Sequence, residues 1–185
     1  MIKIQLLDDD PHILSALQRV LRPHRWEVHS FSDGQAALEA LCEHEFAVII
    51  SDYQMPNLDG ITYLQFAKQR QPHAIRMMLS AHGDRQSMMQ AINRAEIYRF
   101  LSKPWDDYEL EAAIKSAIDL YLLRFENQRL LAQGWTDAIR HLYPDERVYT
   151  FWDYFRQHWQ KNAGLRIDHL LLNPVLARRL ENAGV

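Results

Sequence analysis

The sequence lacks several features, and each absence excludes a class of protein. Cys42 is the single cysteine, so no disulfide can form within the chain. No apolar run approaches the roughly 20 residues that cross a bilayer, so we expect no membrane segment. The first residues enter a strand-like run without a signal-peptide layout, which favours the cytoplasm. A formal net charge of -3 gives no overall basic excess, so nucleic acid is not the expected partner.

The composition instead predicts a packed globular fold. Of the 185 residues, 48% are hydrophobic and 24% are charged. This length accommodates one well-cored domain and leaves a remainder that is short for a second one.

Short apolar runs alternate with longer amphipathic stretches over the first two thirds of the chain, which is typical of a parallel sheet with crossover helices. The expected strands are residues 2–7, 26–31, 46–51, 75–80 and 98–101, and the expected helices are residues 11–21, 34–42, 60–70, 84–94 and one beginning near 106. Five such units with right-handed crossovers predict a doubly wound α/β sheet, for which the flavodoxin-like order is a common solution.

Ligands of such sheets bind beyond the carboxyl ends of the strands, and acids, a hydroxyl and a lysine gather at these ends. Asp8 and Asp9 follow the first strand, Asp52 the third, Ser80 ends the fourth, and Lys103 follows the fifth. Phosphoryl transfer to a carboxylate needs a nucleophilic aspartate, a hard divalent cation and fixed donors around the transferred group. The five side chains supply the aspartate, carboxylate ligands for the cation and the donors. The alternative interpretation is that Asp8 and Asp9 are solvated acidic residues of a turn and do not bind a metal.

The same residues resemble the receiver domain of bacterial response regulators over residues 1 to about 122. The resemblance rests on four motifs, at residues 7–11 (LDDDP), 48–60 (VIISDYQMPNLDG), 79–81 (LSA) and 98–105 (YRFLSKPW). It implies the strand order 2-1-3-4-5 and a signalling protein of a phosphorelay rather than an enzyme. A histidine kinase or phosphotransfer protein would be its phosphodonor.

The resemblance also assigns roles to individual residues. Asp52 would accept the phosphoryl group, and Asp9 would bind Mg²⁺ directly. Asp8 would act partly through water, and the main-chain carbonyl of Gln54 would be a further ligand.

A conformational switch is implied as well. Ser80 and Phe100 occupy the two switch positions, the hydroxyl moving toward the phosphoryl group and the ring turning inward. Lys103 would pair with the phosphoryl group, and its peptide bond to Pro104 would be cis. Taken alone, Phe100 is equally well a core aromatic residue.

Asp10 stands apart from the other acids. It precedes Pro11, and an aspartate followed by proline is typical of a helix N-cap and first helical residue. We therefore expect it to cap the first helix and not to bind metal.

The last helix of the receiver keeps its apolar spacing past residue 122, and Gly134 is expected to end it. Three parts follow from this: a receiver (1–122), a helical extension or linker (123–133) and a small α+β tail (134–185). The tail is predicted to hold strands at 147–155 and 165–172 and a short helix after Pro174.

The tail resembles a fragment of the exonuclease III family of DNA-repair nucleases. The similar residues are 134–138 (GWTDA), 149–154 (YTFWDY) and 164–172 (GLRIDHLLL). The resemblance implies that Asp168 would orient a catalytic histidine, but the chain lacks that histidine and the family's metal-binding glutamate. We therefore expect a catalytically incomplete fragment.

Two other functions remain open beside the receiver. The chain could be an interaction or dimerisation module, with a homodimer formed through the extended helix and tail. A nuclease is the third and least favoured reading.

Overall fold

The computed structural model describes residues 1–81, 95–145 and 171–180 and contains a five-stranded parallel sheet. Its strands are β1 (Lys3–Leu7), β2 (Glu27–Phe31), β3 (Val48–Asp52), β4 (Ile75–Ala81) and β5 (Ile97–Lys103). Their order is β2-β1-β3-β4-β5, with every neighbouring pair parallel. The predicted flavodoxin-like sheet is therefore confirmed.

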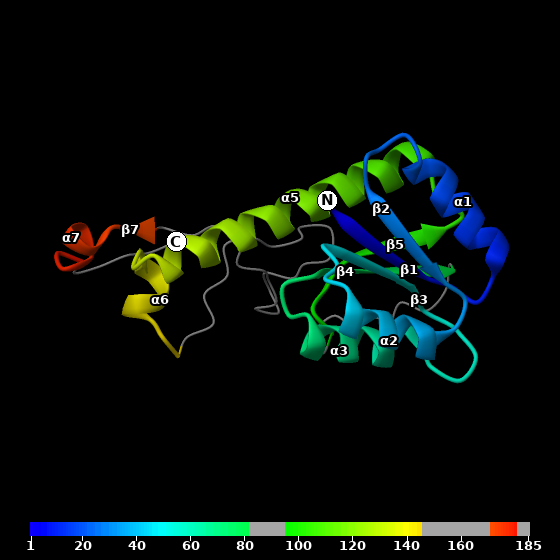
Figure 1. Ribbon diagram of the computed structural model, residues 1–185, viewed down its shortest axis with the longest axis horizontal. Helices are drawn as coiled ribbons and strands as arrows, with labels where there is room; N and C mark the ends of the chain where they lie inside the picture. Colours follow the sequence, from blue (N-terminus) through cyan, green and yellow to red (C-terminus); the bar gives the residue numbers. More distant parts are fainter. Residues whose placement is uncertain (82–94, 146–170, 181–185) are drawn as a thin grey trace. The chain divides into compact units, whose positions relative to one another are not determined.

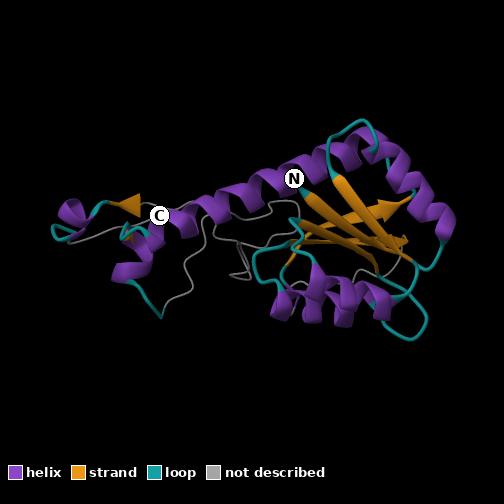
Figure 2. Cartoon of the chain, in the orientation of Figure 1, coloured by secondary structure: helices purple, strands orange, loops and turns teal. Residues whose placement is uncertain are grey.

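Helices cover both faces of this sheet. They are α1 (Pro11–Leu21), α2 (Gly34–Glu43), α3 (Gly60–Arg70) and α5 (Asp107–Ala132). Figure 1 shows α2 and α3 together below the sheet, with α1 and the first turns of α5 on the other side, and Figure 2 separates the two layers from the strands by colour. The helix predicted at residues 84–94 lies outside the described residues.

Burial on both faces explains the composition of the central strands. Every residue of β3 is buried, as are the first six residues of β4, and most of these residues are apolar without an alternation of polar and apolar positions. Gln5 in β1 is an exception, since it is a fully buried amide. Its Nε2 donates to the carbonyl of Ala37 at 2.9 Å, and the hydroxyl of Tyr63 donates to its Oε1. Both ends of the amide are thereby satisfied.

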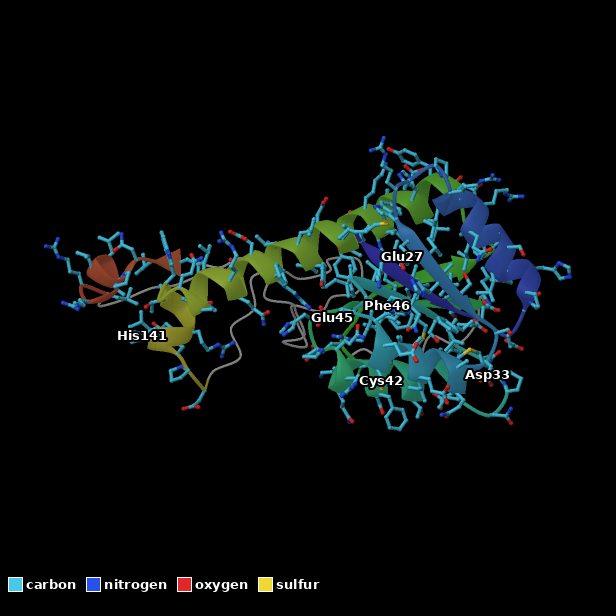
Figure 3. All side chains as sticks on the ribbon, in the orientation of Figure 1. Glu27, Asp33, Cys42, Glu45, Phe46 and His141 are labelled. Atoms are coloured by element: carbon cyan, nitrogen blue, oxygen red, sulfur yellow. The ribbon has the colours of Figure 1, made fainter. Side chains whose placement is uncertain are left out.

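Aspartates begin the first three helices at the carboxyl edge of the sheet. Asp10 accepts a hydrogen bond from the amide of His12, Asp33 from that of Ala36 and Asp59 from that of Thr62. Figure 3 labels Asp33 at the start of α2. The predicted N-cap role of Asp10 is confirmed, and each cap satisfies a helix amide that otherwise has no intrahelical acceptor.

The chain divides into two compact units, Met1–Leu122 and Leu123–Val185, and the division falls within α5. In the first unit, α5 buries Leu110, Ile114 and Ala117 as its spacing predicted. The helix ends at Ala132, and Gly134 has a φ of 89°, in the left-handed region that favours glycine after a helix.

The second unit holds the short elements β6 (Thr136–Asp137), α6 (Ala138–Leu142), β7 (Leu171–Leu172) and α7 (Pro174–Ala177). β6 pairs antiparallel with β7, a pairing that was not predicted. The helix expected after Pro174 is α7. The predicted strand at 147–155 and most of the one at 165–172 lie outside the described residues.

None of the helices within the described ranges combines the length and apolar character needed to cross a membrane.

Candidate functional site

Three aspartates meet at the carboxyl edge of the sheet. In the β1–β3 ladder Leu7 pairs with Ser51, so the residues that follow them, Asp8 and Asp52, lie at the same level of the sheet. Asp9 follows Asp8 in the loop to α1. Each of the three side chains offers a carboxylate oxygen, and these oxygens lie within 4.8 Å of one another. The structure therefore brings together the three acids that the sequence predicted.

Lys103 joins this cluster from the end of β5. Its Nζ is 2.6 Å from Oδ2 of Asp8 and 2.7 Å from Oδ1 of Asp52, so one ammonium bridges acids from two strands. The Lys103–Pro104 peptide bond is cis, as expected. With all four groups ionised, three carboxylates and one ammonium leave a formal charge of about -2, which favours a divalent cation.

Burial and ion pairing act in opposite directions on these groups. Burial raises the pKa of Asp8 above the ordinary value for aspartate, and this effect outweighs the hydrogen bond and charge of Lys103 that lower it. For Lys103, burial alone would lower the pKa, but its hydrogen bonds to Asp52 and Asp8 more than compensate, so the pKa is raised. The ammonium form of Lys103 is thus strongly favoured at neutral pH.

The loop from β3 to α3 holds the backbone of Asp52 in place. The amide of Gly60 donates to the carbonyl of Tyr53 at 3.0 Å, which closes the loop. A Cβ on Gly60 would overlap the backbone carbonyl of Asp52, so only glycine permits this approach. The hydroxyl of Ser51 also donates to the Asp52 carbonyl at 2.9 Å.

Ser80 lies near the acids on the neighbouring strand. Asp52 pairs with Leu79 in the β3–β4 ladder, so Ser80 is one residue further along β4. It is 4% exposed, and its hydroxyl donates to the carbonyl of Ala81 at 3.0 Å. The described geometry therefore puts the hydroxyl at the same edge of the sheet as the carboxylates.

The other two predicted residues lie at the borders of the cluster. Phe100 is in β5 opposite Met78 and is partly buried against the apolar core beneath α2 and α3. Gln54 is exposed in the loop two residues after Asp52, where it lines a hollow of about 420 Å³ with Tyr53 and Met55.

The donor set fits a magnesium ion. Carboxylate oxygens are the ligands that Mg²⁺ prefers, and an incomplete protein shell suits an ion that retains several waters. Among the described residues, this is the one group of three or more acidic, histidine or cysteine side chains close enough to hold a metal.

Comparison with known proteins identifies the family. The sequence profile of the response regulator receiver domain matches residues 4–115. The chain belongs to the response regulator receiver family. The transcriptional regulatory protein FixJ of Bradyrhizobium diazoefficiens is 36% identical over 115 residues, which is 62% of this chain and 56% of FixJ. The DNA-binding transcriptional regulator NtrC of Escherichia coli is 32% identical over 136 residues, 74% of this chain and 29% of NtrC.

Solved receiver structures share the fold. The signal receiver domain of an HD domain-containing protein from Pseudomonas fluorescens matches with a TM-score of 0.63 and 38% identity, covering 65% of this chain and 96% of that one. This receiver spans only about a quarter to just over half of the length of the curated relatives that it matches, for example 26% of the hydrogenase transcriptional regulatory protein HoxA of Bradyrhizobium diazoefficiens.

Sequence reasoning missed two parts of the site. It paired Lys103 with a phosphoryl group and did not anticipate that the ammonium bridges Asp8 and Asp52. It placed Gly60 at the start of a helix, whereas the glycine is also required by the close approach of the Asp52 carbonyl. The Asp59-Gly60 pair at the N-terminus of the expected helix 60–70 was the available signal for the second.

Proposed function

We propose that residues 1–122 accept a phosphoryl group on Asp52, in a reaction that requires Mg²⁺, from a histidine kinase or phosphotransfer protein of the cytoplasm. The observation that carries this proposal is the convergence of Asp8, Asp9, Asp52 and Lys103 at one edge of the sheet. Membership of the receiver family supports it independently.

Each residue has a separate task in this proposal. Asp52, 7% exposed and fixed through its backbone, is the nucleophile. Asp8, Asp9 and the main-chain carbonyl of Gln54 hold the ion, which supplies positive charge to offset the phosphoryl oxygens. Lys103 binds a further phosphoryl oxygen as a point charge, and the hydroxyl of Ser80 donates to another.

The added negative charge then provides the switch. Transfer converts the Asp52 carboxylate into an acyl phosphate, whose phosphoryl oxygens compete with Asp8 for the ammonium of Lys103 and are strong acceptors for Ser80. Movement of Ser80 toward them frees space beside Met78, to which the partly buried ring of Phe100 can shift. The receiver would act on an output partner through the surface at which Phe100 changes position.

The test is labelling of the whole chain with acetyl phosphate, a small phosphodonor, followed by intact-mass spectrometry. We expect one added phosphoryl group in the presence of Mg²⁺, none in EDTA and none for Asp52→Asn. Asp33→Asn is the matched control, because it makes the same chemical change at a helix cap where asparagine serves equally well. Persistent labelling of Asp52→Asn would contradict the assignment.

We further propose that residues 123–133 are a helical extension and that residues 134–185 are a catalytically incomplete fragment of the exonuclease III type. The second half of α5 exposes Leu122, Leu123 and Phe125 at 47%, 46% and 55%. Apolar surface of this kind favours an interface, and a second copy of the chain is the candidate partner. Light scattering of the chain with and without beryllofluoride, a phosphoryl mimic, tests this, and a monomer under both conditions counts against it.

A further inference from the structure

A buried arginine lies in β4 at the end of the sheet away from the acids. Arg76 is 1% exposed and is the largest of the fully buried side chains. Burying a charge is costly unless it is paired and hydrogen-bonded, so the surroundings of this guanidinium must compensate for the loss of water.

Arg76 donates hydrogen bonds to backbone carbonyls that precede β4 and β5 in the sequence. Its Nη1 donates to the carbonyl of Ala74, just before β4, at 2.7 Å. Its Nε donates to the carbonyl of Ala95, shortly before β5, at 2.8 Å. The rigid fork of the guanidinium therefore connects the entries of two neighbouring strands.

Glu96 adds a second connection at the same place. Its carboxylate is 3.4 Å from Nη2 of Arg76 and 2.8 Å from Nζ of Lys68 in α3. Its φ is 49°, in the left-handed region that a residue with a side chain adopts only at a cost. The two cations thus support an unfavourable turn immediately before β5.

The β4–β5 ladder shifts its register directly beside this arginine. Arg76 pairs with Ile97, but the next residue, Met77, pairs with Arg99, so Tyr98 is an extra residue on β5. Beyond the shift, Ala81 pairs with Lys103. Without the shift Ser102 would lie opposite Ala81, and a slip of one residue moves every later side chain to the other face of the sheet.

We infer that Arg76 is a positioning residue for Lys103: by fixing the entry of β5 and its extra residue, it sets the register that places the Lys103 ammonium between Asp8 and Asp52. The inference rests on the proposed function, in which Lys103 serves phosphoryl transfer. It differs from a general packing role because β5 carries Lys103, whereas the three acids come from β1 and β3.

This separation of strands defines the test. In Arg76→Met the acids keep their backbone supports and lose the neighbouring positive charge of Lys103, so the Mg²⁺ affinity measured by calorimetry should be retained or should rise. The rate of labelling by acetyl phosphate at saturating Mg²⁺ should fall on the order of tenfold, because a displaced ammonium no longer fits the phosphoryl group. In Arg76→Lys a single ammonium replaces the fork of the guanidinium, so the labelling rate should fall by about two- to threefold.

Leu41→Ala is the control for lost stability. Leu41 is 4% exposed in α2, and shortening it weakens the core while leaving the guanidinium of Arg76 and its acceptors Ala74 and Ala95 in place. Hydrogen exchange supplies a readout that does not depend on phosphorylation. In Arg76→Met the β5 amides should exchange faster relative to those of β3, whereas in Leu41→Ala both strands should change alike.

A labelling rate for Arg76→Met equal to that of Leu41→Ala, or a uniform change in exchange, would overturn the inference. If Arg76→Met does not fold, Arg76→Lys serves as the test variant. A labelling rate of Arg76→Lys equal to that of the natural protein then overturns the inference. Absence of labelling in the natural protein would instead refute the proposed function, and the exchange comparison would still test the register.

Discussion

Replacing Lys103 by methionine removes the one ammonium that bridges Asp8 and Asp52. The side chains of Asp8 and Asp52 are only 1% and 10% exposed, and that of Lys103 is 20% exposed. Removing one partner of a buried ion pair costs about 3–5 kcal/mol, and partial exposure of Lys103 reduces this to roughly 2–3 kcal/mol. For a chain of this length the melting temperature should fall by about 5–10 °C.

The loss should depend on pH in a defined direction. Burial already raises the pKa of Asp8 above 3.8 in the folded protein, and loss of the lysine raises it further. The folded state then binds a proton more readily than the unfolded state, so the ionised acid destabilises the fold above its folded pKa. As the pH falls through that pKa, Asp8 becomes neutral and the deficit of Lys103→Met shrinks.

Urea denaturation in EDTA at pH 7 and pH 5 measures the deficit. Lys115→Met is the matched control, because Lys115 also pairs with a carboxylate, that of Glu111, but is 52% exposed. Its removal should cost at most about 0.5 kcal/mol. The reasoning is refuted if the two variants lose equal stability, or if the deficit of Lys103→Met grows toward pH 5.

Two further substitutions test the loop that presents Asp52. Asp59→Ala removes the cap of α3 and should cost about 1 kcal/mol in urea denaturation. Burial alone would raise the pKa of Asp59, but hydrogen bonds from Thr62 outweigh it and lower the pKa, so this difference should be full above pH 4 and fade as the pH falls further. Gly60→Ala forces a methyl group against the Asp52 carbonyl and should cost about 3 kcal/mol while slowing labelling by acetyl phosphate. An unchanged midpoint for either variant would show that the loop adapts freely.

Most of the fold could be predicted from local signals in the sequence. Asp10 before Pro11 predicted the first turn of α1, and the structure begins that helix at Pro11. The buried strands β3 and β4 read as apolar runs because helices cover both of their faces. The meeting of Asp8, Asp52 and Lys103 was predictable because carboxyl ends of parallel strands share one edge.

Features that depend on distant partners were not predictable. Gln5 read as a polar residue within a strand, and its acceptor role toward Tyr63 joins positions 58 residues apart. Arg76 gave no signal of its own, because its acceptors are backbone carbonyls, and that of Ala95 is 19 residues away. The extra residue at Tyr98 was equally hidden, so the strand was predicted as residues 98–101 while β5 runs from Ile97 to Lys103.

The aspartates at the carboxyl edge form two sets that evolution can treat differently. In one set the carboxylate receives the amide of the following helix, and asparagine presents the same oxygen to that amide. In the other set, under the proposed function, the negative charge itself is required, and asparagine carries no charge. Drift from aspartate to asparagine is therefore tolerable at 10, 33 and 59, whereas under the proposed function the same drift at 8, 9 and 52 would leave a folded protein that no longer accepts a phosphoryl group.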